Sequence, residues 1–262
     1  MSRNPVITRG SGVPVLLVHG WAVDHRIMLP LDQSFASHPG GWRRIYVDLL
    51  GFGSSVDRPS ISHADDIAAD LDDVIDREIG SRPFAVVGSS FGAGLARRLA
   101  VRRPEQVLGA AMLCPTAEPI ASRRLPEARA VEVDEGLLAG LADSDRAHFT
   151  AVTTRQTADV WRRFEQHVLP GLRAADPDVV QRIRPALSQS PETMGPPYPG
   201  PVLMMLGRND TVVGWRDQLD LAEHYPNATV VIVDRCGHNV HLEHPDLTHH
   251  HLHTWLDSLP TR

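Results

Sequence analysis

One short pattern in the chain, at residues 85–94, limits the possible folds more than any other. An apolar stretch typical of a β-strand ends in G-S-S-F-G at 88–92, and small residues typical of a tightly packed helix follow at once. A serine at the tip of so tight a strand-to-helix turn leaves no room for a Cβ two residues to either side. The glycines flank Ser90 in this way and do not flank Ser89, so we expect Ser90 to be a nucleophile.

Size and composition indicate a globular protein that acts on small molecules. The chain has 262 residues and a formal net charge of -6, and it has no run of five or more like charges. Nothing therefore suggests nucleic acid or an anionic membrane as a partner. No apolar stretch is long enough to span a membrane, and Cys114 and Cys236 are far apart. We expect a cytoplasmic protein with free, buried thiols and an oligomeric state that the sequence does not reveal.

Apolar stretches alternate with amphipathic ones along most of the chain, which predicts an α/β fold with a doubly wound, mostly parallel sheet. Continuous apolar stretches are typical of strands covered on both faces. The expected strands are 13–20, 44–49, 84–88, 107–113, 201–206 and 229–233. The expected helices are 62–80, the one after Ser90, 214–225 and 245–259.

The alternation is interrupted between residues 116 and 195. Amphipathic helix patterns replace it at 127–141 and 145–168, and Asp176-Pro177 predicts a capped helix start. We interpret 116–195 as an inserted helical cap. The core domain then consists of residues 1–115 and 196–262.

Two further residues can activate a serine. Its hydroxyl is a weak nucleophile at neutral pH, so it needs a neighbouring base, and the base needs a partner that fixes its tautomer. Asp210 follows the fifth expected strand and His238 follows the sixth. Both therefore belong to loops at the same sheet edge as Ser90. We therefore expect Asp210 to be the acid and His238 to be the base.

The order Ser90, Asp210, His238 resembles that of the α/β-hydrolase superfamily, as do four motifs. They are His19-Gly-Trp21, D-L-L-G-F-G-S-S at 48–55, the G-S-S-F-G turn at 88–92, called the nucleophile elbow in this superfamily, and the segment from Gly237 to Asp246. By this resemblance the backbone N–H groups of Trp21 and Phe91 form an oxyanion hole. His19 is expected to be structural, and Asp48 to brace the turn at 51–53.

The predicted activity is that of a cofactor-free and metal-free serine hydrolase, similar to an esterase. Its expected substrate is a small to medium, largely uncharged carboxylic ester, lactone or thioester, cleaved through an acyl-enzyme on Ser90. Two alternatives stay open. One is a C–C bond hydrolase of ring-cleavage products, although Ser90-Phe-Gly-Ala93 and Asn239 differ from the usual pattern of those relatives. The other is a non-hydrolytic relative, such as a lyase, a cofactor-free oxygenase or a ligand sensor.

A cluster of histidines near the C-terminus suggests metal binding at first sight. His249 and His253 are four residues apart and so share one helical face. A structural zinc site needs two further ligands, and we assign no metal site here.

Overall fold

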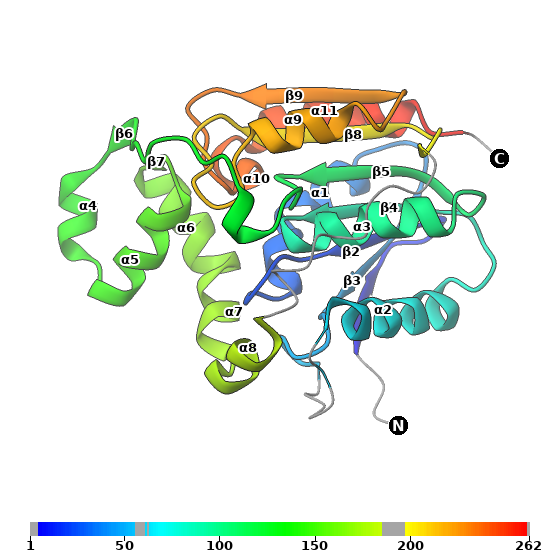
Figure 1. The fold of residues 1–262 in the computed structure, drawn as a ribbon, viewed down its shortest axis with the longest axis horizontal. Helices are drawn as coiled ribbons and strands as arrows, with labels where there is room; N and C mark the ends of the chain where they lie inside the picture. Colours follow the sequence, from blue (N-terminus) through cyan, green and yellow to red (C-terminus); the bar gives the residue numbers. More distant parts are fainter. Residues whose placement is uncertain (1–4, 56–60, 62, 185–196, 261–262) are drawn as a thin grey trace.

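A seven-stranded sheet forms the centre of the protein, as the computed structural model shows (Figure 1). The structure describes residues 5–55, 61, 63–184 and 197–260. The strand order is β1-β3-β2-β4-β5-β8-β9. The strands are β1 (Val6–Arg9), β2 (Val13–Val18), β3 (Trp42–Val47), β4 (Phe84–Ser89), β5 (Val107–Leu113), β8 (Val202–Gly207) and β9 (Ala228–Val233).

All neighbouring pairs in this sheet are parallel except β1 with β3. The predicted α/β class and mostly parallel sheet are therefore confirmed, and each of the six expected strands is present. The antiparallel edge strand β1 was not predicted. It is only four residues long and mostly exposed, so it lacks the continuous apolar stretch that identifies a buried strand.

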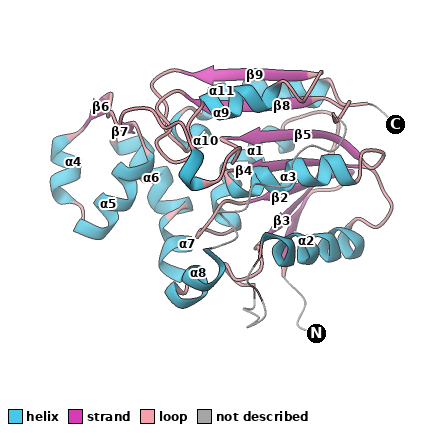
Figure 2. Cartoon of the chain, viewed as in Figure 1, coloured by secondary structure: helices cyan, strands magenta, loops and turns pink. Residues whose placement is uncertain are grey.

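Helices cover both faces of the sheet (Figure 2). Leu16 and Val18 of β2 face one apolar cluster, while Val15 and Leu17 face the other, as the two-residue period of a strand requires. The first cluster includes residues of α2 (Ala64–Glu78) and α3 (Phe91–Arg102), with α9 (Arg216–Ala222) packed against it. The second includes residues of η1 (His25–Leu31), α1 (Asp32–Ala36), α10 (Val240–Glu243) and α11 (Pro245–Asp257).

The segment between β5 and β8 is mostly helical and lies beside the carboxyl ends of the strands (Figure 1). It contains η2 (Ile120–Ser122), β6 (Glu132–Val133), α4 (Glu135–Gly140), α5 (Asp143–Val152), β7 (Arg155–Gln156), α6 (Ala158–His167), α7 (Leu169–Ala174) and α8 (Pro177–Ile183). The predicted start of α8 is confirmed, because Asp176 accepts hydrogen bonds from the first-turn N–H groups. The expected boundary at residue 195 lies outside the described residues.

Two long helices predicted in this segment are wrong. The expected helix 127–141 has no regular structure before β6, and within it only α4 is helical, with its N-terminus capped by the Asp134 side chain. The expected helix 145–168 is divided into α5 and α6 by the short strand β7. The N–H groups of Thr154 and Arg155 donate to Glu243, so a contact from outside the segment replaces two helical hydrogen bonds.

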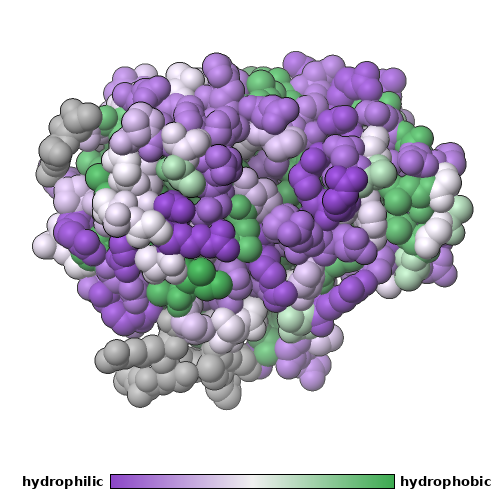
Figure 3. Space-filling view, turned by 180° about the vertical axis from the view of Figure 1, so that it is seen from behind, coloured by the Kyte–Doolittle hydropathy of each residue, from purple (hydrophilic) through white to green (hydrophobic). Residues whose placement is uncertain are grey.

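The face of the molecule shown in Figure 3 is mainly polar. Hydrophilic residues cover most of the face shown in Figure 3, and hydrophobic residues occur there in separate patches. Within the described residues, no helix combines the length and hydropathy that crossing a bilayer requires. Both cysteines, Cys114 and Cys236, are buried free thiols, as predicted.

Candidate active site

Ser90 occupies the turn between β4 and α3 with φ 55° and ψ -116°. A positive φ is unfavourable for a residue with a Cβ, so the surroundings must hold this conformation. A Cβ at Gly88 would overlap the backbone of Gly92 and Ala93, and one at Gly92 would overlap the carbonyls of Val18 and His19. The steric reason given for both glycines is thus visible in the structure.

The loops after β8 and β9 bring Asp210 and His238 together. Asp210 is completely buried, and its Oδ1 accepts hydrogen bonds from the N–H groups of Val212 (2.8 Å) and Val213 (3.0 Å). Its Oδ2 lies 2.8 Å from Nδ1 of His238. Because a carboxylate only accepts, Nδ1 carries the hydrogen, and Nε2 is left with a lone pair that can take a proton.

Ser90 and His238 line the same cavity of about 260 Å³. Its walls are largely apolar and come from both the core and the helical segment. Among them are Val23, Ile27, Phe164, Val168, Leu172 and Val213. Among the residues that the structure describes, no hydrogen bond joins Ser90 Oγ to His238. Catalytic hydrogen bonds often tighten only when substrate is bound.

The loop after β2 packs directly against Ser90. A Cβ placed on Gly20 would lie 3.2 Å from Ser90 Cβ and 3.9 Å from its Oγ. In the described part of the chain, the backbone N–H groups of Trp21 and Phe91 have no hydrogen-bond partner. The Trp21 and Phe91 rings meet edge to face with their centroids 5.5 Å apart, so the two loops support each other.

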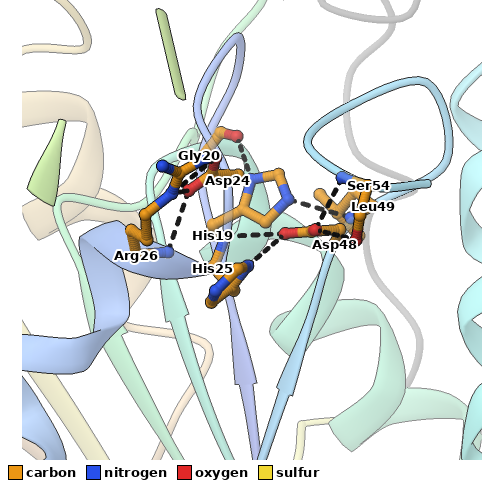
Figure 4. Close-up of polar contacts among 8 residues, drawn as sticks. All are labelled: His19, Gly20, Asp24, His25, Arg26, Asp48, Leu49 and Ser54. Carbon is orange, nitrogen blue, oxygen red and sulfur yellow. Dashed lines mark hydrogen bonds and ion pairs between the residues drawn. The ribbon is translucent and has the colours of Figure 1, made fainter. Parts of the chain in front are cut away.

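The His19 side chain holds this loop in place by hydrogen bonds to backbone groups (Figure 4). Its Nε2 accepts the N–H of Leu49 (2.9 Å), so its Nδ1 carries the hydrogen and donates to the carbonyl of Gly20 (2.7 Å). Burial lowers the pKa of His19, which favours this neutral form. Here His19 contacts backbone groups, in agreement with the structural role expected of it.

Asp48 braces the following turn, as the sequence predicted. Its Oδ2 accepts hydrogen bonds from both N (2.8 Å) and Oγ (2.6 Å) of Ser54. Its Oδ1 accepts them from N (2.9 Å) and Nδ1 (2.8 Å) of His25. A Cβ on Gly53 would lie against the Asp48 carboxyl group, so this turn also depends on glycine.

Two clusters of potential metal ligands exist among the described residues. One consists of Cys114, Asp210 and His238, and the other of Asp24, His25 and Asp48. In both clusters the carboxylates already accept hydrogen bonds. Burial also raises the pKa of Cys114 well above its usual range, which disfavours the thiolate that binds metals. We assign neither cluster to a metal.

The histidine pair on α11 is also engaged with serine hydroxyls. His249 Nδ1 lies 3.1 Å from Ser34 Oγ, and His253 Nε2 lies 3.2 Å from Ser37 Oγ. The absence of a metal and of a cofactor stays a prediction.

Sequence reasoning identified only part of the cavity wall. The sequence of the helical segment offers six apolar residues that could either line an acyl site or pack within the segment: Leu137, Leu138, Phe149, Val152, Trp161 and Phe164. Of these six, Val152 and Phe164 line the cavity. Phe149 and Trp161 instead pack against Phe164, with ring centroids 5.3 and 6.0 Å from it. Arg123 and His148 also line the cavity and were missed. No local pattern marks them, because their position depends on how the segment folds back over the sheet.

Comparison with known proteins identifies the family to which this chain belongs. A family model described as alpha/beta hydrolase fold matches residues 13–245. The chain belongs to the α/β hydrolase fold family. A structure titled as an alpha/beta superfamily hydrolase from Oenococcus oeni PSU-1 superimposes with a TM-score of 0.88 at 27% identity, covering 98% of this chain and 96% of that one.

Two curated relatives of this α/β hydrolase are enzymes with different substrates. A 2-hydroxymuconate semialdehyde hydrolase of Pseudomonas putida is 28% identical over 93% of this chain and 87% of its own length. A pimeloyl-[acyl-carrier protein] methyl ester esterase of Xanthomonas campestris pv. campestris (strain B100) is 27% identical over 96% of this chain and 98% of its own. Both are hydrolases, which supports a hydrolase acting on a small molecule and leaves the bond it cleaves open.

Proposed function

We propose that this α/β hydrolase is a serine hydrolase that cleaves a small to medium carboxylic ester, with lactones and thioesters as related substrates. The observation that carries the proposal is the meeting of Ser90 and His238 at one apolar cavity, with His238 bound to Asp210 on its far side. These three groups have the order and the contacts of a proton-handling chain. The helical segment acts as the cap that closes the cavity.

The reaction has two steps. Nε2 of His238 takes the proton of Ser90 as Oγ attacks the ester carbonyl, and Asp210 stabilises the imidazolium that forms. His238 then gives the proton to the departing alcohol, which leaves an acyl group on Ser90. A water molecule repeats the attack with His238 as base, releasing the acid and restoring the serine.

The backbone supplies the stabilisation of negative charge. We assign the oxyanion hole to the N–H groups of Trp21 and Phe91, which have no other partner among the described residues. His19 contributes indirectly, because it fixes the carbonyl of Gly20 and with it the plane of the peptide that carries the Trp21 N–H. One such donor is worth roughly 3 kcal/mol of transition-state stabilisation.

A C–C bond hydrolase is the second candidate. It is favoured by the identity with the 2-hydroxymuconate semialdehyde hydrolase over most of both chains. We prefer the esterase hypothesis for two reasons. The chain matches an ester-cleaving relative to a similar extent. The sequence around Ser90 and His238 also lacks the pattern usual in C–C hydrolases. A cytoplasmic location and the absence of nucleic-acid or membrane partners stay predictions.

Labelling and turnover together test the proposal. A fluorophosphonate probe should label the wild-type protein and fail to label Ser90→Ala, with Ser89→Ala as a matched control that keeps its labelling. Short p-nitrophenyl esters should then be hydrolysed with the same dependence on Ser90. Labelling without ester turnover would favour the C–C hydrolase, and the absence of Ser90-dependent labelling would favour a non-hydrolytic relative.

A further inference from the structure

Among the residues that the structure describes, those lining the cavity that holds Ser90 include an arginine and no acid. Arg123 lies directly after η2 and is part of the cavity wall. Among the described residues that form this wall there is no aspartate or glutamate. His148 is the other basic side chain of the wall besides His238, and it is exposed. The cavity is therefore apolar with one permanent positive charge at its side.

Arg123 is held in place without being neutralised. Its Nε donates to the carbonyl of Glu118 (3.1 Å) and its Nη1 donates to the carbonyl of Val212 (2.9 Å). Both partners are backbone groups, and within the described residues Arg123 has no carboxylate partner. A guanidinium has five N–H donors in a planar fork, so donors on both terminal nitrogens stay available.

The two acids whose charges act on Arg123, Asp210 and Asp217, already bind other groups. Asp217 binds the guanidinium and the backbone N–H of the neighbouring Arg124. Asp210 accepts hydrogen bonds from Val212, Val213 and His238. Burial lowers the pKa of Arg123, and the charges of Asp210 and Asp217 partly oppose this effect. A half-buried cation without a directly bound acid gains strongly from an anionic partner.

We propose that Arg123 is a specificity-determining residue that binds a carboxylate on the substrate, so that the preferred substrate is an ester bearing a second, free carboxyl group. This inference rests on the proposed ester hydrolysis and adds the substrate class. It replaces the sequence-based expectation of a largely uncharged substrate with an anionic one. The apolar wall receives the chain that joins the two carboxyl functions, and Arg123 binds the end that is not cleaved.

Matched esters test this assignment. The p-nitrophenyl monoester of adipate and p-nitrophenyl hexanoate differ only in a terminal carboxylate or methyl group, and suberate and octanoate form a longer pair. Wild-type kcat/KM is expected to favour the anionic member of at least one pair by about 10- to 100-fold, the range of a charge-assisted hydrogen bond. Arg123→Gln should reduce this preference to about one, and Arg123→Lys should retain part of it.

Arg124→Gln is the matched control. Arg124 carries the same group one residue further on, but it is bound to Asp217 and Asp220 and is not part of the cavity wall. Its variant should keep the ratio between the two esters. If circular dichroism shows that Arg123→Gln is not folded, Arg123→Lys replaces it as the test variant. The wild-type ratio of kcat/KM between the anionic and the neutral ester is then also measured at increasing salt, because added salt weakens a charge-based preference.

The outcomes separate this inference from the proposed function. Hydrolysis of the neutral ester with no preference that depends on Arg123 overturns the inference alone. An equal loss on both esters in Arg123→Gln also overturns it, since Arg123 would then support Asp210 and not the substrate. If neither ester is hydrolysed, the ester hydrolase proposal fails. Calorimetric binding of monomethyl adipate to wild type and Arg123→Gln then tests the carboxylate site, and equal affinities overturn it.

Discussion

Two imidazole–carboxylate pairs lie in segments that follow strands of the sheet, and they share the same Nδ1–carboxylate distance. Nδ1 of His238 is 2.8 Å from Asp210, and Nδ1 of His25 is 2.8 Å from Asp48. Both carboxylates are buried. The surroundings differ, because His238 lines the cavity that contains Ser90 and His25 does not.

The difference shows that a histidine–aspartate pair does not by itself make a proton-handling site. Asp48 accepts hydrogen bonds from backbone and side-chain donors of both His25 and Ser54, so it holds two loop segments together. Burial alone would raise the pKa of Asp48, but these hydrogen bonds outweigh burial and hold it well below its usual range. The His25 pair is therefore a structural brace, whereas the His238 pair borders the cavity in which we propose that it acts.

The largest predicted contrast comes from removing each imidazole. His238→Ala should lower kcat for ester hydrolysis by about 10⁴- to 10⁶-fold, because the base is lost. His25→Ala removes the same group from outside the cavity, so its kcat should stay within about threefold of wild type in the folded protein. Steady-state kinetics below both melting temperatures provides the measurement. Comparable losses of kcat in His238→Ala and His25→Ala would show that the proposed difference between the two pairs is wrong.

Replacing the acids by their amides should separate activity from stability. Asp210→Asn should lower kcat by about 10⁴-fold, because an amide N–H facing Nδ1 selects the tautomer whose Nε2 cannot accept a proton. Asp48→Asn should instead reduce the free energy of unfolding by about 3 to 5 kcal/mol, since a buried, fully bonded anion is lost. Urea unfolding and kinetics on both variants test this. A fully active Asp210→Asn would show that Asp210 is not the acid on which His238 depends.

The elbow and the residues at the strand ends were predictable because local sequence and a general rule of sheet topology determine their positions. Steric crowding around Ser90 requires glycine at 88 and 92 whatever the rest of the chain does. Asp210 and His238 were placed by a rule of parallel sheets, that the loops after successive strands share one edge. These arguments need no knowledge of distant contacts.

The helical segment was predicted less well because contacts with residues far away in the sequence determine where its helices begin and end. Its division between α5 and α6 follows from Glu243, which lies 89 residues after Thr154 in the chain. The placement of Arg123 in the cavity depends in the same way on Val212, which is 89 residues further on. Helical periodicity does not contain such contacts, so the cavity wall had to come from the structure.

Glu243 extends the comparison to a third buried carboxylate, whose pKa is shifted in the direction opposite to that of Asp48. Burial raises its pKa to about 7, against hydrogen bonds from the N–H groups of Arg155, Thr154 and Gly237, and the charge of Asp210 adds to the rise. Cys236 is a buried neighbour, and the guanidinium of Arg155 donates to the Glu243 carbonyl. Unlike Asp48, this carboxylate therefore becomes protonated near neutral pH.

The sign of this shift gives a stability prediction. A folded-state pKa above the ordinary value of 4.5 means that the stabilising contribution is complete below pH 4.5 and is lost as the pH rises through about 7. Glu243→Gln does not titrate. The unfolding free energy of wild type minus that of Glu243→Gln should therefore fall by about 3 kcal/mol from pH 4.5 to pH 8. A difference that grows with pH would show that the three N–H donors outweigh burial.

The smallest effect is expected at Ser54, which separates the side-chain from the backbone part of the Asp48 brace. Ser54→Ala removes the Oγ–H donor to Asp48 Oδ2 but keeps the donor at the backbone N. The expected cost is about 1 kcal/mol, or a fall in Tm of about 2 to 4 °C, with unchanged labelling of Ser90. The double variant with Asp48→Asn should lose less than the sum of the single losses, because the two residues share one hydrogen bond. Strict additivity would mean that this hydrogen bond contributes nothing, and that the turn depends on the backbone contacts alone.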